Sequence, residues 1–448
     1  MVCSNEQSKR SSTLLVTLDS SFLRMPLPDW RSAVLPFLFA RFTRLWSVVL
    51  LATSVSPALG QDAGLGTHEV LLETPGGDLA FTIALSTEGG DVRAEVVNGP
   101  ERIPVTVRKD KSSFALDFPH FASEIVFEMD VGKLMRRTQR DELISGMWTK
   151  RRGPDQDAKV PCQLRKVVTR RWESPEPFLG RWSVSFADSD DLAVGVFERF
   201  RGKEVLGTFL TTTGDYRYLH GGVLNGRLRL TCFDGAHAFL FHSGIAADGV
   251  LSGEFYSGNW YRDTWTATRD ENARLPDAFQ QTSLAGSENL AGLEFPDAEG
   301  RPHELSELAK QGTVTLVEVF GTWCPNCHDE AAYLKELRGK YGGKGLQVVG
   351  LAFELSGDFE KDALQVQRYR DRFGIDYPIL IAGTSDKALA SKQFPIVDRI
   401  RSYPTTLFVD RNGKIRAVYT GFSGPATGKA HVRLRGAFEA LIDKLMQE

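Results

Sequence analysis

Residues 317–327 read Val-Glu-Val-Phe-Gly-Thr-Trp-Cys-Pro-Asn-Cys, so an apolar, strand-like segment ends on two cysteines separated by two residues. A helical pattern follows as far as Tyr341. Pro325 falls at the first helical position, where the fixed φ and the missing N–H of proline cost least. The stretch therefore predicts a strand, a tight turn and a helix that begins at the cysteine pair.

The two cysteines of this stretch have the spacing of a redox-active pair. Cys324 would face the free N–H groups at the helix N-terminus, which favour a thiolate, so we expect it to be the nucleophile that attacks a partner's disulfide. Cys327 would lie one turn deeper on the same helix face, where it can resolve the mixed disulfide. The pair predicts a redox-active disulfide between Cys324 and Cys327 that opens and closes during catalysis.

Two other interpretations of the cysteine pair have less support. A zinc site would need two further ligands at compact spacing, but no second C-x-x-C and no H-x3-5-H follows in the sequence. We therefore expect no metal. A structural disulfide within the turn stays open as an alternative, because such a bond can remain oxidised and take no part in catalysis.

The composition is that of an ordinary soluble globular chain. Its 448 residues are long enough for about three domains. The net charge is -3, with 25% charged and 42% hydrophobic residues, which gives no signature of nucleic-acid binding. Basic residues concentrate between Lys133 and Arg171, but acidic residues are interspersed, which favours a solvated face or a linker. We expect no nucleic-acid partner.

The N-terminal segment, residues 1–60, has the features of an export signal. Two arginines precede the apolar residues 45–52, and small residues follow before Gln61, which predicts cleavage at the end of the segment. The apolar stretch is shorter than the ~20 residues that span a bilayer, although an uncleaved signal could still anchor the chain. Met25 is an alternative start. We expect a periplasmic or otherwise exported protein.

Residues 61–172 and 173–272 are expected to form two β-rich modules. Short segments of alternating apolar residues are separated there by turn signals such as Asn98-Gly99. Residues 114–127 resemble residues 228–241, and a Ser-Gly pair follows each copy, which indicates two related halves. Antiparallel strands with protected edges would form two small barrels or one larger barrel.

The second module has a weak similarity to lipocalin-like barrels, because Gly180-Arg181-Trp182 resembles the Gly-x-Trp of their first strand. Its aromatic residues are Phe209, Tyr216, Tyr218, Phe239, Phe241, Phe255, Tyr256, Trp260, Tyr261 and Trp265. They could line a ligand cavity, but a packed core is favoured. We expect partner binding, positioning or stabilisation from both modules, unpaired Cys162 and Cys232, and a linker at residues 273–288.

Residues 289–448 alternate strand-like and helix-like segments, which predicts a three-layer α/β domain. The expected strands cover 313–320, 346–352, 377–381, 405–410 and 415–420, and the expected helices cover 325–341, 358–373, 386–394 and a segment from about 431. Trp323 to Cys327, Glu330, and Tyr403 to Gly413 make this domain resemble the thioredoxin superfamily, specifically the TlpA and ResA branch of thiol-disulfide oxidoreductases. The expected fold class is multidomain, with two β-rich, barrel-like modules followed by an α/β thioredoxin-like domain.

The resemblance assigns roles to three residues around the cysteine pair. It implies a cis peptide bond before Pro404, with the proline against the sulfurs and the Tyr403 backbone turned toward a partner peptide. An ordinary proline at the start of a strand is the alternative. Trp323 and Tyr403 would contact the substrate.

Two carboxylates are candidates for moving protons. Glu318 stands six residues before Cys324 and matches the buried acid of thioredoxins, where burial raises a carboxyl pKa and makes it a suitable base for Cys327. Glu330 matches the active-site glutamate of ResA-like proteins. The competing interpretations are a solvent-facing strand residue for Glu318 and a helix-surface residue for Glu330.

The resemblance implies an exported thiol-disulfide oxidoreductase that reduces protein disulfides, uses no cofactor and is re-reduced by a membrane thiol electron donor, with cytochrome c maturation as the first role to consider. A thioredoxin-fold peroxidase is a second hypothesis, but Val317 and Gly321 occupy the Pro and Thr places of the peroxidase frame Pro-x3-Thr-x2-Cys. A third hypothesis is a β-module binding protein with a redox-regulated appendage. Pro325-Asn326 leaves the direction of electron flow open, and the oligomeric state is not predicted.

Overall fold

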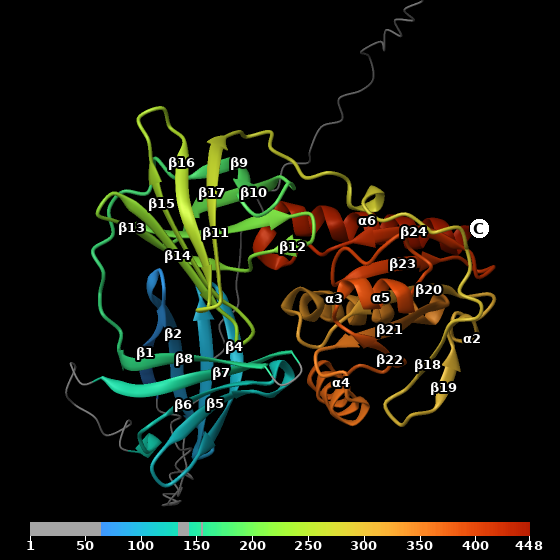
Figure 1. Ribbon diagram of the computed structural model, residues 1–448, viewed down its shortest axis with the longest axis horizontal. Coiled ribbons are helices and arrows are strands. Elements are labelled where there is room, and N and C mark those ends of the chain that lie inside the picture. The colour runs from blue at the N-terminus through green and yellow to red at the C-terminus, as the bar shows by residue number, and fades with distance from the viewer. Residues whose placement is uncertain (1–63, 133–142, 154–155) are drawn as a thin grey trace, which may run out of the picture. The chain divides into compact units, whose positions relative to one another are not determined.

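The computed structural model describes residues 64–132, 143–153 and 156–448 (Figure 1). The predicted export signal therefore lies outside the described residues. The described residues all belong to one compact unit. Within the described part of the chain, none of the helices is both long enough and apolar enough to span a bilayer.

Strands β1 to β8 form a closed antiparallel barrel, called barrel 1 below. Its elements are β1 (Gly64–Thr74), β2 (Gly77–Glu88), β3 (Asp91–Asn98), β4 (Glu101–Lys109), β5 (Phe114–Phe118), η1 (Pro119–Phe121), β6 (Ser123–Phe127), β7 (Ile144–Gly153) and β8 (Gln156–Lys166). Alternate residues of β2 are buried, as the two-residue period of a strand requires. Strand β1 pairs with both β2 and β8, which closes the ring and removes its edges.

A second antiparallel sheet, β9 to β17, forms barrel 2. Its strands are β9 (Gly180–Phe186), β10 (Ala193–Arg199), β11 (Glu204–Thr211), β12 (Gly214–Asp215), β13 (Leu219–Leu224), β14 (Arg227–Phe233), β15 (Ala238–Ile245), β16 (Leu251–Ser257) and β17 (Tyr261–Arg269). Pairing of β10 with β11 closes the ring, and the short β12 adds to β11. The prediction of barrel-like modules is confirmed.

Aromatic side chains pack tightly inside barrel 2. Phe209 stacks on Phe241 with ring centroids 4.4 Å apart, and Trp265 meets Phe209 edge-on at 5.2 Å. The packed core favoured from the sequence is therefore observed for these residues. Cys162 in barrel 1 and Cys232 in barrel 2 are buried free thiols, as expected.

The two barrels share a hydrophobic contact. Phe233 of barrel 2 stacks on Phe81 of barrel 1 with ring centroids 4.2 Å apart, and the Asn98 side-chain amide donates to the Phe233 carbonyl oxygen at 2.9 Å. The internal repeat also occupies equivalent places, because residues 114–127 and 228–241 lie in the fifth and sixth strands of their respective rings. The two halves inferred from the sequence are thus two barrels of the same strand order.

The C-terminal domain is a five-stranded sheet with helices packed against it (Figure 1). The strand order is β22-β21-β20-β23-β24, with β20, β21 and β22 parallel and the last two strands antiparallel. Its elements are η2 (Ala278–Gln280), β18 (Glu294–Pro296), β19 (Pro302–Glu304), α2 (Leu305–Leu308), β20 (Val314–Phe320), α3 (Pro325–Tyr341), η3 (Gly342–Lys344), β21 (Leu346–Glu354), α4 (Phe359–Phe373), β22 (Ile379–Thr384), α5 (Lys387–Gln393), β23 (Thr405–Val409), β24 (Ile415–Thr420), η4 (Pro425–Thr427) and α6 (Lys429–Gln447). The strands and helices expected from the sequence are observed, with small differences at their ends.

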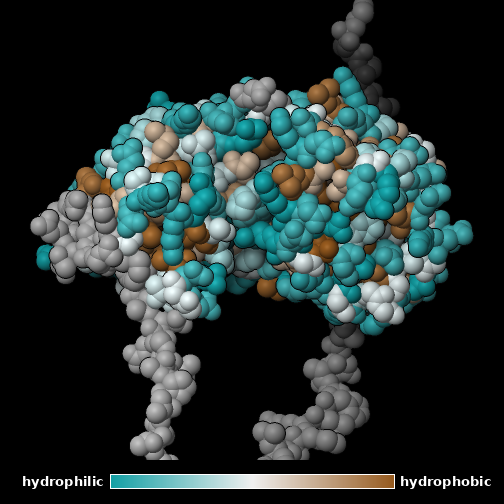
Figure 2. Space-filling model, turned by 90° about the horizontal axis from the view of Figure 1, so that it is seen from below, coloured by the Kyte–Doolittle hydropathy of each residue, from teal (hydrophilic) through white to brown (hydrophobic). Residues whose placement is uncertain are grey.

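The core of this domain is centred on β20, whose seven residues are all buried. Helices α3 and α6 are joined by the Tyr333 hydroxyl, which donates to the Arg435 carbonyl oxygen at 3.0 Å. Figure 2 shows one face of the molecule, on which hydrophilic residues predominate and hydrophobic residues form small separate groups. The cysteine pair thus follows the central, buried strand of the sheet.

Candidate redox site

The cysteine pair lies where β20 ends and α3 begins. Cys324 is the N-cap of α3, and the backbone N–H of Cys327 donates to its sulfur at 3.3 Å. Pro325 occupies the first helical position, as predicted. Cys324 keeps 7% of its surface exposed, Cys327 is fully buried, and both are free thiols. Cys324 is therefore the sulfur that a substrate can reach.

The proline loop lies directly against the nucleophile. The Tyr403–Pro404 peptide bond is cis, which confirms the prediction for Pro404. The Cys324 thiol donates to the Tyr403 carbonyl oxygen at 3.3 Å. The Trp323 indole N–H donates to the Phe353 carbonyl oxygen at 2.9 Å, and the Trp323 ring lies edge-on to Tyr403 with centroids 5.5 Å apart. Two aromatic residues thus flank the reactive sulfur.

Glu318 and Glu330 are both fully buried, which excludes the surface interpretations of these residues. Thr406 pairs with Glu318 across the sheet and donates its hydroxyl to Glu330 Oε1 at 2.6 Å. Both Glu318 oxygens and Glu330 Oε2 have no hydrogen-bond partner among the described residues. Burial raises the pKa of Glu330 to about 8. Burial, together with the charges of Glu330 and Cys324, also raises the pKa of Glu318 well above its usual range.

Cys327 shares this buried environment. Burial raises the pKa of its thiol well above the usual range, and Cys324 and Glu318 act in the same direction. A base is therefore needed to remove the Cys327 proton when a mixed disulfide is resolved. Glu318 and Glu330 are the two candidates for this base.

A third buried acid, Glu354, was not predicted. It ends β21 and accepts hydrogen bonds from the backbone N–H and the hydroxyl of Thr322 at 2.9 and 2.7 Å. Burial raises its pKa to about 7. A signal was available, because an acid at the end of an apolar parallel strand lies at the same sheet edge as the end of its neighbour. Glu354 holds the turn that carries Cys324.

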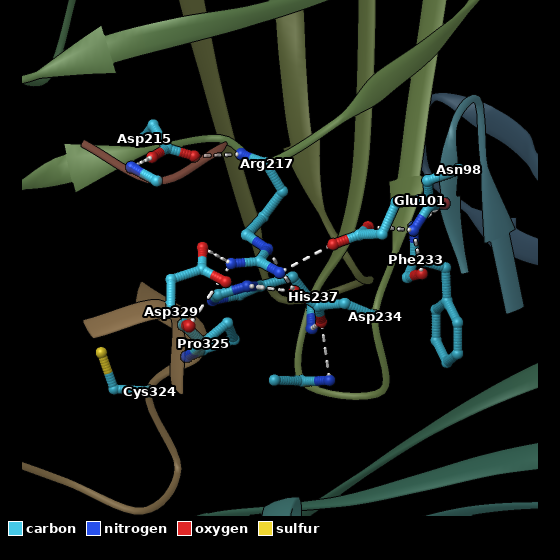
Figure 3. Close-up of polar contacts among 12 residues, drawn as sticks. Asn98, Glu101, Asp215, Arg217, Phe233, Asp234, His237, Cys324, Pro325 and Asp329 are labelled. Atoms are coloured by element: carbon cyan, nitrogen blue, oxygen red, sulfur yellow. Dashed lines mark hydrogen bonds and ion pairs between the residues drawn. The ribbon is translucent and has the colours of Figure 1, made fainter. Parts of the chain in front are cut away.

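Arg217 of barrel 2 reaches the helix that carries the cysteines (Figure 3). Its guanidinium donates to the Asp329 carboxylate of α3 and, at 3.4 Å, to the Pro325 carbonyl oxygen. The same group donates to Glu101 of barrel 1 at 2.8 Å, and its Nε lies 3.8 Å from an Asp234 oxygen. One buried cation therefore ties both barrels to the start of α3.

Residues 211–217, which we call the rim segment, lie against both loops that surround Cys324. The Ser402 hydroxyl, next to the proline loop, donates to the Thr213 carbonyl oxygen at 2.6 Å. Gly214 touches the side-chain amide of Asn326, which stands between the two cysteines, and a Cβ at Gly214 would overlap that amide. The rim segment is therefore part of the wall around the nucleophile.

Cys324 opens on a pocket of about 470 Å³ that is lined by barrel 2, the C-terminal domain and Arg152 of barrel 1. Trp323 and Tyr403 line one side of it, and the rim segment lines the other. A larger pocket of about 720 Å³ lies between the rim segment and α6, and neither Cys324 nor Cys327 lines it. Because Cys324 lines the smaller pocket, that pocket is the candidate substrate site.

Known proteins resemble the region that contains this site. Residues 288–418 match the AhpC/TSA family. The chain is 32% identical over 146 residues to the thiol-disulfide oxidoreductase ResA of Halalkalibacterium halodurans, covering 32% of this chain and 73% of that protein. The chain belongs to the ResA-like thiol-disulfide oxidoreductases. It is also 27% identical over 153 residues to ResA of Geobacillus thermodenitrificans, covering 34% of this chain and 79% of that one.

Among solved structures, a thiol:disulfide interchange protein of the thioredoxin family from Chlorobium tepidum is 23% identical to this ResA-like chain. The match has a TM-score of 0.25 and covers 33% of this chain and 97% of that one. As a ResA-like enzyme, the chain carries out thiol-disulfide exchange. Both barrels lie outside the residues that match the AhpC/TSA family, so their role has to be inferred from their contacts with the site.

Proposed function

We propose that this ResA-like enzyme is exported and reduces protein disulfides, with Cys324 as the nucleophile and Cys327 as the resolving thiol. One observation carries the proposal: Cys324 borders a pocket, whereas Cys327 is fully buried behind it. A substrate that enters the pocket can meet only the first sulfur, which sets the order of the two exchange steps. A structural disulfide that takes no part in catalysis would not require a pocket beside its sulfur.

The proposed cycle transfers two electrons to the substrate. The Cys324 thiolate attacks one sulfur of the substrate disulfide, and the other substrate sulfur leaves as a thiolate that takes up a proton. The deprotonated Cys327 then attacks the Cys324 sulfur, which releases the second substrate sulfur as a thiolate that takes up a proton to become a thiol. The enzyme ends with a Cys324–Cys327 disulfide, and the substrate ends with two thiols.

Glu318 is the proposed base for Cys327. The Cys324 charge contributes to the raised pKa of Glu318, so formation of the mixed disulfide removes that charge and lowers the pKa. A larger fraction of the carboxyl group is then ionised, and so able to accept a proton, at the step in which Cys327 must lose its proton. Glu330, whose carboxyl group accepts a hydrogen bond from the Thr406 hydroxyl, is proposed to influence the pKa of Glu318 through its own charge.

The remaining proposals concern partners and location. Trp323 and Tyr403 are proposed to contact the substrate, because both line the pocket beside Cys324. A membrane thiol electron donor is proposed to reduce the Cys324–Cys327 disulfide after each turnover, and cytochrome c maturation is the proposed setting. The export pattern of residues 1–60 supports an extracytoplasmic location.

Insulin reduction by the full chain tests the proposal. Cys324→Ser should abolish turnover, and Cys327→Ser should accumulate a mixed disulfide with the substrate. Cys162→Ala, at a buried free thiol in barrel 1, is the matched control and should keep the activity. A wild-type enzyme that reduces neither insulin nor a small disulfide would overturn the proposal, and rapid consumption of peroxide would favour the peroxidase alternative.

A further inference from the structure

The pocket beside Cys324 has an aromatic wall that barrel 2 supplies. Its aromatic residues from barrel 2 are Tyr216, Phe239, Phe255, Trp260 and Tyr261. The Tyr216 ring lies 5.1 Å from Phe239 and 5.2 Å from Phe255, and Tyr261 lies 5.9 Å from Phe255, so these four side chains form a continuous surface. Rings arranged in this way bind aromatic and apolar groups.

The charged residues of the same pocket are mainly basic. Arg152 and Lys387 line it, and Asp215 is the acid among the described lining residues; His237 also lines it and contacts the Asp234 carboxylate at 3.2 Å. The Asp215 carboxylate is already engaged, because it accepts hydrogen bonds from two backbone N–H groups at 2.8 and 2.6 Å. The pocket therefore presents positive charge to a ligand.

Arg152 and Lys387 are each held in place by a neutral partner. The Arg152 guanidinium lies over the Trp260 ring, 4.7 Å from its centroid. The Lys387 ammonium donates to the Arg401 carbonyl oxygen at 2.6 Å. Because a ring and a carbonyl oxygen are neutral partners, both cations can still attract a carboxylate.

Contacts on both sides of Cys324 fix this wall relative to the sulfur. The rim segment bonds to Ser402 beside the proline loop and touches Asn326 between the cysteines. Arg217, two residues after β12, binds Asp329 on α3. The aromatic and basic surface is thus built into the same site as the nucleophile.

We propose that barrel 2 forms half of the substrate site, and that the pocket binds an extended peptide segment whose disulfide-bonded cysteine stands beside an aromatic residue and acidic residues. The inference rests on the proposed function, because the segment presents its disulfide to Cys324 for the two-electron reduction described above. The aromatic side chain packs on the barrel wall, and the carboxylates face Arg152 and Lys387. A volume of about 470 Å³ suits a few side chains rather than a folded domain.

Disulfide dimers of three short peptides test the inference on the full chain: Glu-Phe-Cys-Glu, Lys-Phe-Cys-Lys and Glu-Ser-Cys-Glu. The neutral 2-hydroxyethyl disulfide serves as a reference. Each enzymatic rate is divided by the rate with dithiothreitol, which corrects for the intrinsic reactivity of each disulfide. At low ionic strength, we expect kcat/KM for the acidic aromatic peptide to exceed that for each of the other two peptides about tenfold.

Charge-reversal variants distinguish an effect of the pocket residues from an effect of the net charge of the protein. Arg152→Glu combined with Lys387→Glu should reverse the preference between the acidic and the basic aromatic peptide. Lys159→Glu combined with Lys392→Glu is the matched control, because it makes the same change in net charge on exposed lysines of β8 and α5 that do not line the pocket. Each readout is a ratio of two substrates on one preparation, so a partly misfolded variant does not distort it.

The outcomes distinguish this inference from the proposed function. Equal kcat/KM values for the three peptides, an equal effect of the two double variants, or faster reduction of 2-hydroxyethyl disulfide than of any peptide would overturn the inference and leave the proposed function in place. A wild-type enzyme that reduces none of these disulfides would overturn the proposed function itself.

Discussion

Replacing Glu330 with glutamine should stabilise the folded enzyme at alkaline pH. Burial raises the pKa of this carboxyl group from 4.5 to about 8, so within this window the folded state keeps a proton that the unfolded chain has lost. The stabilising effect of the raised pKa is fully present below 4.5 and is lost as the pH rises to about 8. One pKa unit corresponds to about 1.4 kcal/mol, so the wild type loses ~5 kcal/mol of unfolding free energy from this group.

Urea unfolding of wild type and Glu330→Gln at about pH 5 and about pH 8.5 measures the effect. At the lower pH the two proteins should be similar, because a glutamine oxygen can still accept the Thr406 hydroxyl. At the higher pH the variant should be more stable by several kcal/mol. Glu336→Gln, on the exposed side of the same helix and paired with Arg435, is the matched control and should change stability by under about 1 kcal/mol at both pH values.

The decisive quantity is the change, from about pH 5 to about pH 8.5, in the stability difference between wild type and Glu330→Gln. If wild type and Glu330→Gln differ by the same amount at both, then Glu330 does not hold its proton through this window and the reasoning from its burial is wrong. A variant that is less stable at alkaline pH would contradict the sign as well as the magnitude.

Three further predictions follow from the same structure. Glu318→Gln should slow resolution more than attack, so that the mixed disulfide accumulates in quenched samples; equal slowing of both steps would contradict its role as a base. Arg217→Met should cost roughly 3–5 kcal/mol in urea unfolding at neutral pH, because it leaves the partly buried Glu101 and Asp329 and the buried Asp234 without their cation, and a loss below about 1 kcal/mol would mean that solvent already screens this network. Phe233→Ala should cost roughly 3–5 kcal/mol, because the ring packs on Phe81 and Trp148, and an unchanged Tm would exclude a shared core between the barrels.

Local patterns predicted the parts of the fold that neighbouring residues determine. Helix α3 runs from Pro325 to Tyr341 as expected, because an N-cap side chain and a proline set its start. The two-residue alternation predicted barrel strands, and closure follows because it protects their edges. The burial of Glu318 could not come from periodicity, since a glutamate in an apolar strand contradicts the pattern, and only the resemblance pointed to it.

Contacts between distant segments could not be predicted from the sequence. Arg217 and Asp329 are 112 residues apart, and each one alone looks like an ordinary charged residue of a turn or a helix. The break in pattern at residues 273–288 likewise predicted a linker but not its path, in which Phe279 packs on Tyr419 with ring centroids 4.9 Å apart. The pocket beside Cys324 depends on such contacts, so its aromatic wall became visible only in the structure.

The contact between Gly214 and Asn326 links barrel 2 to the dipeptide between the two cysteines. The dipeptide within a C-x-x-C pair helps to set how readily the cysteines give up electrons. Here one residue of that dipeptide touches a barrel glycine that has no room for a Cβ. A larger residue at position 326 would therefore require a compensating change in the rim segment. Substitutions at position 326 are therefore expected to change both the reduction potential of the cysteine pair and the fit of α3 against barrel 2.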